Sequence, residues 1–150
     1  MQPKFTHSGK RSVCPVNVIV EIVGDQWSFL ILRDILLLQR SRYSEFRDAD
    51  EGVATNILAK RLKHLVDHGL IEKHQDPADG RGSIYLPTDR ALDLIPVLLA
   101  MIAWSDTHQS NAKKYPELMA IYAADPSRAE TLLKARAQAL WTQSKSSIDE

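Results

Sequence analysis

The feature that most constrains the fold is a pair of short β-prone runs joined by a turn-forming segment. The runs are residues 70–75 and 83–86, and the segment between them reads Asp-Pro-Ala-Asp-Gly-Arg-Gly. Gly, Pro and Asp favour turns, so this stretch predicts a β-hairpin. The apolar spacing elsewhere is helical. The sequence therefore predicts a mainly α fold with one small β-hairpin.

The first two helices are predicted from the residues at their ends. Cys14-Pro15 opens an apolar stretch that stops at Gly24, and Pro suits the first turn of a helix while Gly follows its last residue. Asp25 is a candidate cap for a second helix that runs to about residue 38. This second helix is apolar on nearly all sides, which predicts a central position.

Two further helices precede the hairpin. A short one covers residues 43–47, with Ser44 as a candidate cap, and a longer one covers residues 54–68 and ends at Gly69. Apolar residues recur along the longer helix at the spacing of one buried stripe. They are Leu58, Leu62, Leu65 and Val66.

The chain returns to helical spacing after the hairpin. Thr88 is a candidate cap for a helix that runs to about Trp104, and Pro96 inside it predicts a kink. Residues 115–124 and 127 to about 143 are predicted to form two more helices. The last residues, about seven, are expected to fray.

Three helices, a helix with cations on one face and a hairpin with a Gly-flanked Arg follow the element order of a winged helix-turn-helix. A recognition helix buries one stripe and presents polar and cationic side chains to DNA. Asn pairs with adenine, and Lys reaches guanine or a phosphate. The candidate DNA-binding residues on the helix are Thr55, Asn56, Lys60 and Lys63.

Two arginines are weaker candidates for DNA contact. Arg61 lies nearer the buried edge of the helix, where it can instead pair with an acid inside the domain. Arg81, between Gly80 and Gly82, can enter a narrow minor groove. The alternative for Arg81 is a loop tip with no partner.

The chain also carries a series of short motifs in a fixed order. They are Cys14-Pro15, Gly24-Asp25-Gln26-Trp27, Leu30-Ile31-Leu32-Arg33, Tyr43-Ser44-Glu45-Phe46-Arg47, Gly52-Val53-Ala54-Thr55-Asn56-Ile57-Leu58-Ala59-Lys60-Arg61-Leu62, Leu65, Gly69-Leu70-Ile71, Tyr85-Leu86-Pro87-Thr88 and Pro96-Val97-Leu98. Their order and spacing over about residues 14–104 resemble HxlR-type bacterial transcriptional regulators.

The resemblance implies a MarR-like winged-helix homodimer that binds a pseudo-palindromic operator. It also implies that the dimer is built by helices flanking the winged domain, here residues 13–23 and the helix from Thr88. Ala91 stands where the family often has Gly, which we expect to be harmless inside a helix. We expect a flexible basic arm at 1–12, a winged-helix DNA-binding domain with its dimerisation helices at 13–104, and a C-terminal helical extension at 105–150.

The expected function is a sequence-specific DNA-binding transcriptional regulator that acts as a homodimer on double-stranded DNA. An enzyme is not expected, because the sequence has no nucleophile motif, no phosphate-binding glycine loop and no paired carboxylates. The alternative is a winged-helix protein-interaction module without DNA specificity. A small-molecule or oxidant effector is compatible with the first function.

Cys14 is the chain's one cysteine and precedes Pro15 at the start of a helix, where the helix dipole, Lys10 and Arg11 favour the thiolate. Some members of the resembled family sense oxidants or electrophiles through a cysteine at this location. The resemblance therefore makes Cys14 a candidate redox-sensing residue. The alternative is a small apolar residue packed in the dimer interface.

Two other residue groups have a functional and an ordinary interpretation. His64 and His68 lie four apart and His74 follows, a spacing that can chelate a metal, but Lys63 is adjacent and no supporting carboxylate is evident. We expect no metal and no cofactor. Four aromatic residues are expected to pack in the core or an interface rather than line a ligand cavity. They are Trp104, Tyr115, Tyr122 and Trp141.

The charge balance restricts how the chain can bind DNA. Nineteen Lys and Arg against nineteen Asp and Glu give a net charge of +0, so any DNA contact must be a local patch. Lys4, Lys10 and Arg11 give residues 1–11 a charge of +3, and residues 54–68 carry +2. No run is apolar enough for a membrane span or a signal peptide, so we expect a cytoplasmic protein with no membrane contact.

Overall fold

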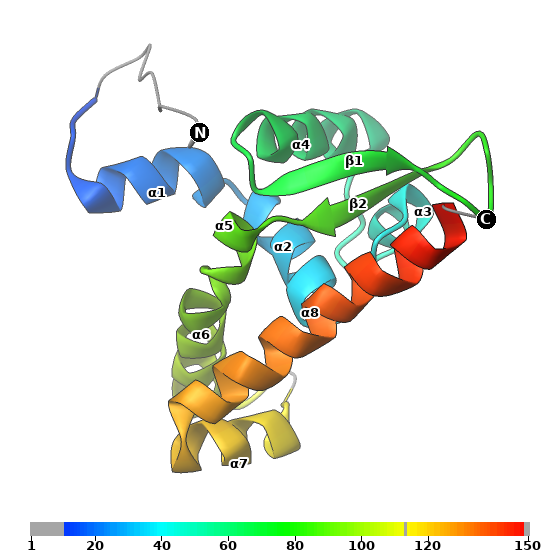
Figure 1. Cartoon of the computed structure of the whole chain (residues 1–150). Helices are drawn as coiled ribbons and strands as arrows, with labels where there is room; N and C mark the ends of the chain where they lie inside the picture. The colour runs from blue at the N-terminus through cyan, green and yellow to red at the C-terminus, as the bar shows by residue number, and fades with distance from the viewer. Residues whose placement is uncertain (1–10, 113, 149–150) are drawn as a thin grey trace.

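The computed structural model describes residues 11–112 and 114–148, in which helices surround one antiparallel hairpin (Figure 1). The elements in chain order are α1 Pro15–Val23, α2 Ser28–Leu36, α3 Tyr43–Arg47, α4 Thr55–Asp67, β1 Ile71–Gln75, β2 Ser83–Pro87, α5 Asp89–Leu92, α6 Ile95–His108, α7 Pro116–Ala124 and α8 Pro126–Ile148. This arrangement confirms the predicted mainly α fold with a winged hairpin. Most of the predicted basic arm, residues 1–10, lies outside the described residues.

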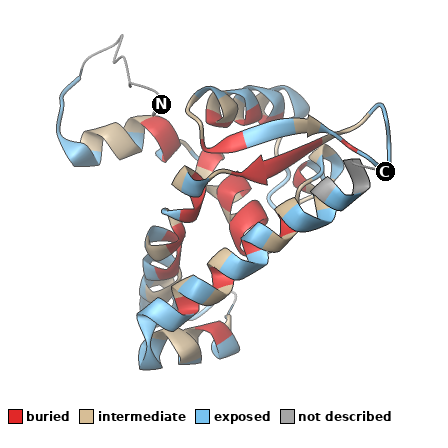
Figure 2. Ribbon diagram, in the orientation of Figure 1, coloured by how far each residue is buried: buried red, intermediate tan, exposed pale blue. Residues whose placement is uncertain are grey.

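The second helix occupies the centre of the core, as its apolar composition predicts. Leu32, Ile35 and Leu36 of α2 are fully buried and belong to one hydrophobic cluster with residues of α4, β2 and α8. Figure 2 shows the buried residues concentrated on α2 and β2. Asp25 caps the turn before α2, because its Oδ1 accepts the N–H groups of Trp27 and Ser28, each at 2.9 Å.

The hairpin lies between α4, which directly precedes it in the sequence, and the C-terminal helix α8. Its strands pair from Ile71 opposite Pro87 to Gln75 opposite Ser83. Gly69, with φ +68°, ends α4 and turns the chain into β1. α4 contacts β1, and α8 contacts β2 (Figure 1).

The predicted kinked helix from Thr88 to Trp104 is instead two helices, α5 and α6. Pro96 has no N–H, and its ring would clash with the carbonyl of Leu92, so α5 ends at Leu92 and Pro96 falls in the first turn of α6. α6 then continues to His108. Thr88 occupies the cap position of α5, but its hydroxyl donates to the carbonyl oxygen of Gly69 at 2.6 Å.

Two other predicted helix features are wrong. Ser44 does not cap α3, because the Oε2 of Glu45 does so by accepting the N–H groups of Ser41 and Arg42, each at 2.8 Å. The last helix does not end near residue 143 but extends to Ile148. One buried side of α8 packs it against the rest of the protein and stabilises its length. The residues on that side are Ala129, Leu133, Ala137 and Leu140.

No single helix among the described residues is long and apolar enough to cross a bilayer. α1 and α2 reach that composition only when taken together, across a bend of 82°.

Candidate nucleic-acid interface

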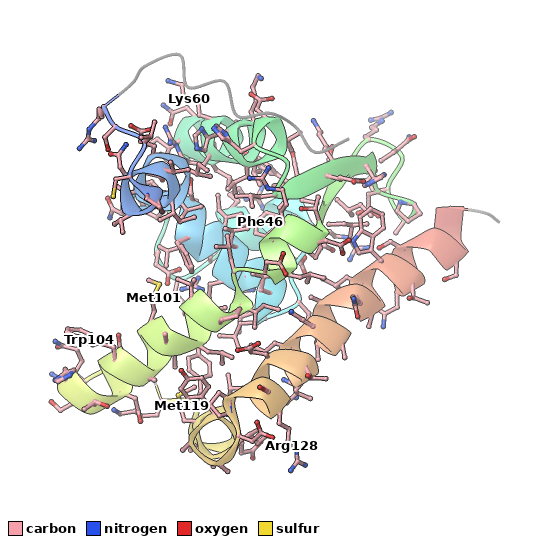
Figure 3. All side chains as sticks on the ribbon, turned by 60° about the vertical axis from the view of Figure 1, so that its left-hand side comes forward. Phe46, Lys60, Met101, Trp104, Met119 and Arg128 are labelled. Atoms are coloured by element: carbon pink, nitrogen blue, oxygen red, sulfur yellow. The ribbon has the colours of Figure 1, made fainter. Side chains whose placement is uncertain are left out.

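The predicted recognition helix is α4, and the structure separates its buried stripe from its polar face. Leu58, Leu62 and Leu65 are buried in the core. The four candidate residues on the opposite face are exposed, namely Thr55, Asn56, Lys60 and Lys63. Lys60 projects from the outer side of α4 (Figure 3). This amphipathic helix holds short polar groups in its first turn and cations further along.

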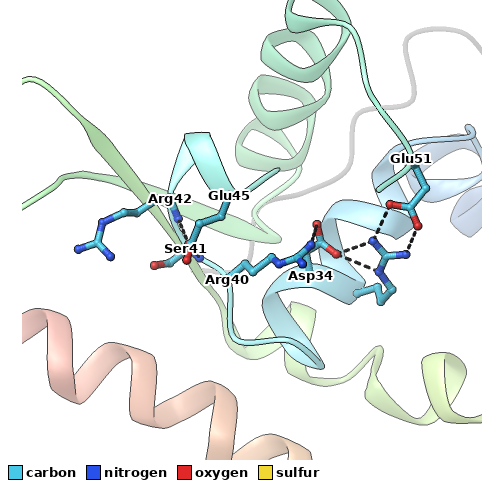
Figure 4. Close-up of polar contacts among 7 residues, drawn as sticks. Asp34, Arg40, Ser41, Arg42, Glu45 and Glu51 are labelled. Carbon is cyan, nitrogen blue, oxygen red and sulfur yellow. Dashed lines mark hydrogen bonds and ion pairs between the residues drawn. The ribbon is translucent and has the colours of Figure 1, made fainter. Parts of the chain in front are cut away.

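Ion pairs fix the start of α4 relative to α2 (Figure 4). Arg33 on α2 donates to both carboxylate oxygens of Glu51 and to Oδ1 of the buried Asp34. These two carboxylates, Glu51 first, raise the pKa of Arg33 well above its usual range. The hydroxyl of Tyr43 donates to the carbonyl of Thr55 at 3.3 Å. The first turn of α4 is therefore held from two sides.

The three cations of α4 differ in their partners. Arg61 lies 3.4 Å from Asp25, so it takes the intradomain pairing considered as its alternative. Lys63 pairs with Asp67 one turn later at 2.6 Å, an exposed pair of little energetic weight. Lys60 makes no ion pair with any residue that the structure describes. Lys60 is thus the least compensated cation of the helix.

Arg81 lies exposed in the loop of the hairpin, and the loop around it is fixed. Asp79 Oδ1 accepts the backbone N–H of Arg81 at 3.1 Å. At the base of the loop, Arg42 Nε donates to Oδ2 of the buried Asp76 at 2.7 Å, and Asp76 Oδ1 accepts the N–H of Ala78 at 2.9 Å. The hydrogen bond from Arg42 holds the pKa of Asp76 below its usual value.

A groove of about 510 Å³ brings α4 and the hairpin together. Its cations come from both elements: Lys63 from α4, and Lys73 and Arg81 from the hairpin. No carboxylate is among the described residues that line it. Lys73 was missed at the sequence level. We call Lys60, Lys63, Lys73 and Arg81 the cationic surface; it suits a polyanion such as a DNA backbone.

The histidines do not converge on a common site. His64 Nε2 lies 2.7 Å from the carbonyl oxygen of Ile22, and His68 Nδ1 lies 2.8 Å from that of His64. His74 is on β1, with its ring against Trp141. Among the described residues, no three His, Cys, Asp or Glu side chains are grouped as metal ligands would be.

Cys14 is exposed at the N-cap of α1. The backbone N–H groups of Asn17 and then Val16 favour the thiolate and lower the pKa of Cys14. Its sulfur is exposed in the single chain, and the alternative of a small apolar residue packed in a dimer interface stays a prediction. The sulfur is chemically accessible in the monomer.

Exposed apolar side chains lie just before α1, on α1 and on α6, and the two helices are on the same side of the molecule (Figure 1). We call these six residues the exposed apolar face. Its exposed fractions are 86% for Val13, 67% for Val16, 49% for Val20, 43% for Val97, 48% for Met101 and 59% for Trp104. Met101 and Trp104 point outward from α6 (Figure 3). Trp104 is therefore no core residue of the monomer, whereas Tyr115, Tyr122 and Trp141 pack against the core. Large exposed apolar faces mark interaction sites.

The element order, the exposed polar face of α4 and the adjoining hairpin define a winged helix-turn-helix protein. The chain belongs to the HxlR-like helix-turn-helix family, whose family model matches residues 22–113. This range contains α2 to α6 and ends before α7 and α8.

Three relatives support this assignment. The HTH-type transcriptional regulator sll1512 of Synechocystis sp. is 35% identical over 89 residues, 59% of this chain and 65% of that protein. The match thus spans less than two thirds of the length of that relative. The crystal structure of PA1607, a transcription-factor candidate, has 33% identity and a TM-score of 0.62, covering 71% of this chain and 74% of that one.

The HTH-type transcriptional regulator YodB of Bacillus subtilis is 27% identical over 96 residues, which are 63% of this chain and 85% of YodB. The structure of its reduced form superposes with a TM-score of 0.53 at 25% identity, over 68% of this chain and 100% of that chain.

Proposed function

We propose that this protein is a sequence-specific, DNA-binding transcriptional regulator without enzymatic activity, which acts on DNA in the cytoplasm. The observation that carries the proposal is the cationic surface, which joins the exposed face of α4 to the wing. In this arrangement α4 enters the major groove while the wing lies over the adjacent minor groove. Transcription regulation is the role named for the relatives sll1512 and YodB.

Each candidate residue has a distinct role in this proposal. Thr55 and Asn56, in the first turn of α4, contact base edges, and Asn56 is suited to adenine. Lys60 and Lys63 contact phosphate or guanine, and Arg81 enters the minor groove. Arg61 acts indirectly, since its pair with Asp25 ties α4 to the turn before α2.

The exposed apolar face on α1 and α6 supports a homodimer. A second copy that covers this face through a two-fold axis would remove the exposed valines, Met101 and Trp104 from water. Two copies of α4 would then meet successive major grooves, with half-sites roughly 34 Å apart on a pseudo-palindromic operator. A small-molecule effector would act by changing that spacing.

Salt dependence tests DNA binding against the alternative of a protein-interaction module. Binding of a double-stranded fragment, followed by fluorescence anisotropy, should weaken steeply as salt rises, because each phosphate contact releases counterions. A protein-interaction module without DNA specificity would show neither affinity at low salt nor this dependence.

Cys14 is a second, independent element of the proposal. Its accessible sulfur and lowered pKa favour reaction with oxidants. Diamide would take two hydrogen atoms from the Cys14 thiols of two protomers, which leaves an intersubunit disulfide and the corresponding hydrazine. We expect diamide to change operator affinity in the wild type and to have no effect in Cys14→Ser; an equal response of both proteins would contradict this role.

A further inference from the structure

We propose that the C-terminal helix α8 positions the wing for DNA binding and that Trp141 is its positioning residue. This inference rests on the proposed contact between Arg81 and DNA. It assigns a role to a segment beyond residues 22–113, the part of the chain that the family model matches.

The first observation is that β2 is buried on both faces. Ile84, Tyr85 and Leu86 are only 2%, 6% and 1% exposed, although successive strand residues point to opposite faces. Tyr85 lines the groove shared with α4. Ile84, on the other face, lines a pocket together with Leu140 of α8. β2 therefore lies between the groove shared with α4 and the C-terminal helix α8.

The second observation is a specific contact between Trp141 and the hairpin. The indole Nε1 donates to the carbonyl oxygen of Pro87, the last residue of β2, at 2.6 Å. The ring of His74 meets the indole edge-on, with centroids 5.3 Å apart. His74 is the cross-strand partner of Ile84, so both strands touch α8 on the same face.

The third observation is that α8 continues along the hairpin as far as the wing loop. Leu140, Gln143 and Ser144 line the same pocket as Asp76 and the two residues after it. α8 therefore runs beside the wing from the end of β2 to the base of the loop that carries Arg81 (Figure 1).

The fourth observation is that α8 is itself firmly anchored. Ala129, Leu133 and Ala137, spaced four residues apart, are fully buried. The side-chain amide of Gln39, a residue with φ +56°, donates to the carbonyl oxygen of Arg136 at 2.9 Å. An anchored helix can transmit a fixed position to the hairpin, which a two-stranded sheet alone would not keep.

Trp141→Phe tests this inference, because it removes the N–H donor and keeps an aromatic ring. Removal of one hydrogen bond of ordinary strength lowers the population of chains with a correctly positioned wing by at most about 5-fold. We therefore expect the affinity for an operator fragment selected from random DNA to fall by up to about 5-fold. Gln138→Ala, on the exposed side of α8, is the matched control and should leave affinity unchanged.

The double variant separates positioning from general destabilisation. If Trp141 acts through Arg81, Trp141→Phe should have no further effect on affinity in an Arg81→Ala background. Multiplicative effects of the two changes, or an unchanged affinity of Trp141→Phe in a chain that binds DNA, would overturn the inference.

Amide hydrogen exchange tests the inference without DNA. We expect Trp141→Phe to speed exchange in β1 and β2 while α4 exchanges at its wild-type rate. Unchanged exchange in the hairpin, or equal acceleration in both regions, would overturn the role of α8. Absence of any DNA binding by the wild type would overturn the proposed function instead.

Discussion

Lys60 and Lys63 lie one turn apart on α4, yet their surroundings differ. Lys63 has Asp67 beside it, whereas Lys60 makes no ion pair among the described residues. The sequence indicates that both lysines face solvent. It does not indicate which lysine has its charge paired with an acid, because Asp67 pairs with only one side chain. At the residue scale the structure therefore ranks candidates that the sequence leaves equal.

If Lys60 contacts a phosphate rather than guanine, Lys60→Gln should lower the slope of log affinity against log salt by about one, because one phosphate contact is lost. The affinity loss should be similar for all DNA sequences, as phosphates carry no base identity. Anisotropy titrations over a range of salt concentrations measure the slope. Lys134→Gln on α8 is the control, and equal slopes for the wild type and Lys60→Gln would contradict the contact.

Cys14 gives a prediction that depends on pH. The neighbouring backbone N–H groups lower its pKa, so more of its thiol is ionised at neutral pH than in a free cysteine. The rate of alkylation by iodoacetamide should therefore rise with pH to a midpoint below that of an unperturbed thiol. N-acetylcysteine is the reference compound. A midpoint equal to or above that of the reference would remove the argument for a reactive thiol.

Other residues show where sequence patterns fail. Lys73 belongs to the cationic surface, but on an exposed strand it looks like any solvated lysine. Lys73 belongs to this surface because it pairs with Tyr85 across the hairpin. This register places the Lys73 side chain on the face of the hairpin that is turned toward α4. Trp104 shows the reverse case, since helical spacing predicts packing, whereas its side chain is 59% exposed.

At the scale of elements, local signals predict most helices and the hairpin correctly. The Pro15 and Gly24 boundaries of α1 and the leucine stripe of α4 are local features, and both are confirmed. The break between α5 and α6 is not predicted by local sequence, because Pro96 is compatible with a kink or with a new helix. Tertiary packing selects between them: Ala91, Leu92 and Ile95 are all buried.

Asp76→Asn should weaken the wing, because it replaces the carboxylate that Arg42 and the N–H of Ala78 share. We expect a cost of about 1 kcal/mol, since Arg42 is half exposed and solvent screens the pair. Thermal unfolding at pH 7 should then shift down by about 2–4 °C. Asp50→Asn, in an exposed turn, is the control.

The same pair predicts how this difference depends on pH. The pKa of Asp76 is lowered in the folded protein, so its stabilisation is present above the unfolded value, about 4, and disappears as pH falls through the folded value. The gap in Tm between wild type and Asp76→Asn should therefore close below about pH 4. A gap that stays constant down to pH 3 would contradict the ionic role of Asp76.

At the scale of the whole molecule, the zero net charge and the cationic surface are compatible. Acids elsewhere balance the Lys and Arg of α4 and the wing, so non-specific attraction to polyanions is weak while a local cationic surface remains. Such a distribution favours recognition of an oriented site over general binding to DNA.

The apolar face of α1 and α6 predicts the oligomeric state. Met101→Asp should convert a dimer into a monomer, because it places a charge in the interface between two copies. Sedimentation velocity at micromolar concentration measures the change. Ala135→Asp, on the exposed side of α8, should leave the dimer intact. A wild-type monomer, or a dimer unaffected by Met101→Asp, would contradict this interface.

Selection of bound fragments from a random double-stranded DNA library at low salt tests the central claim most directly. We predict enrichment of an inverted repeat whose half-sites are centred one helical turn apart, roughly 34 Å. Asn56→Ala should lose selectivity within each half-site while it retains the phosphate contacts. Failure of the wild-type protein to enrich any motif would contradict sequence-specific DNA binding and favour the protein-interaction module.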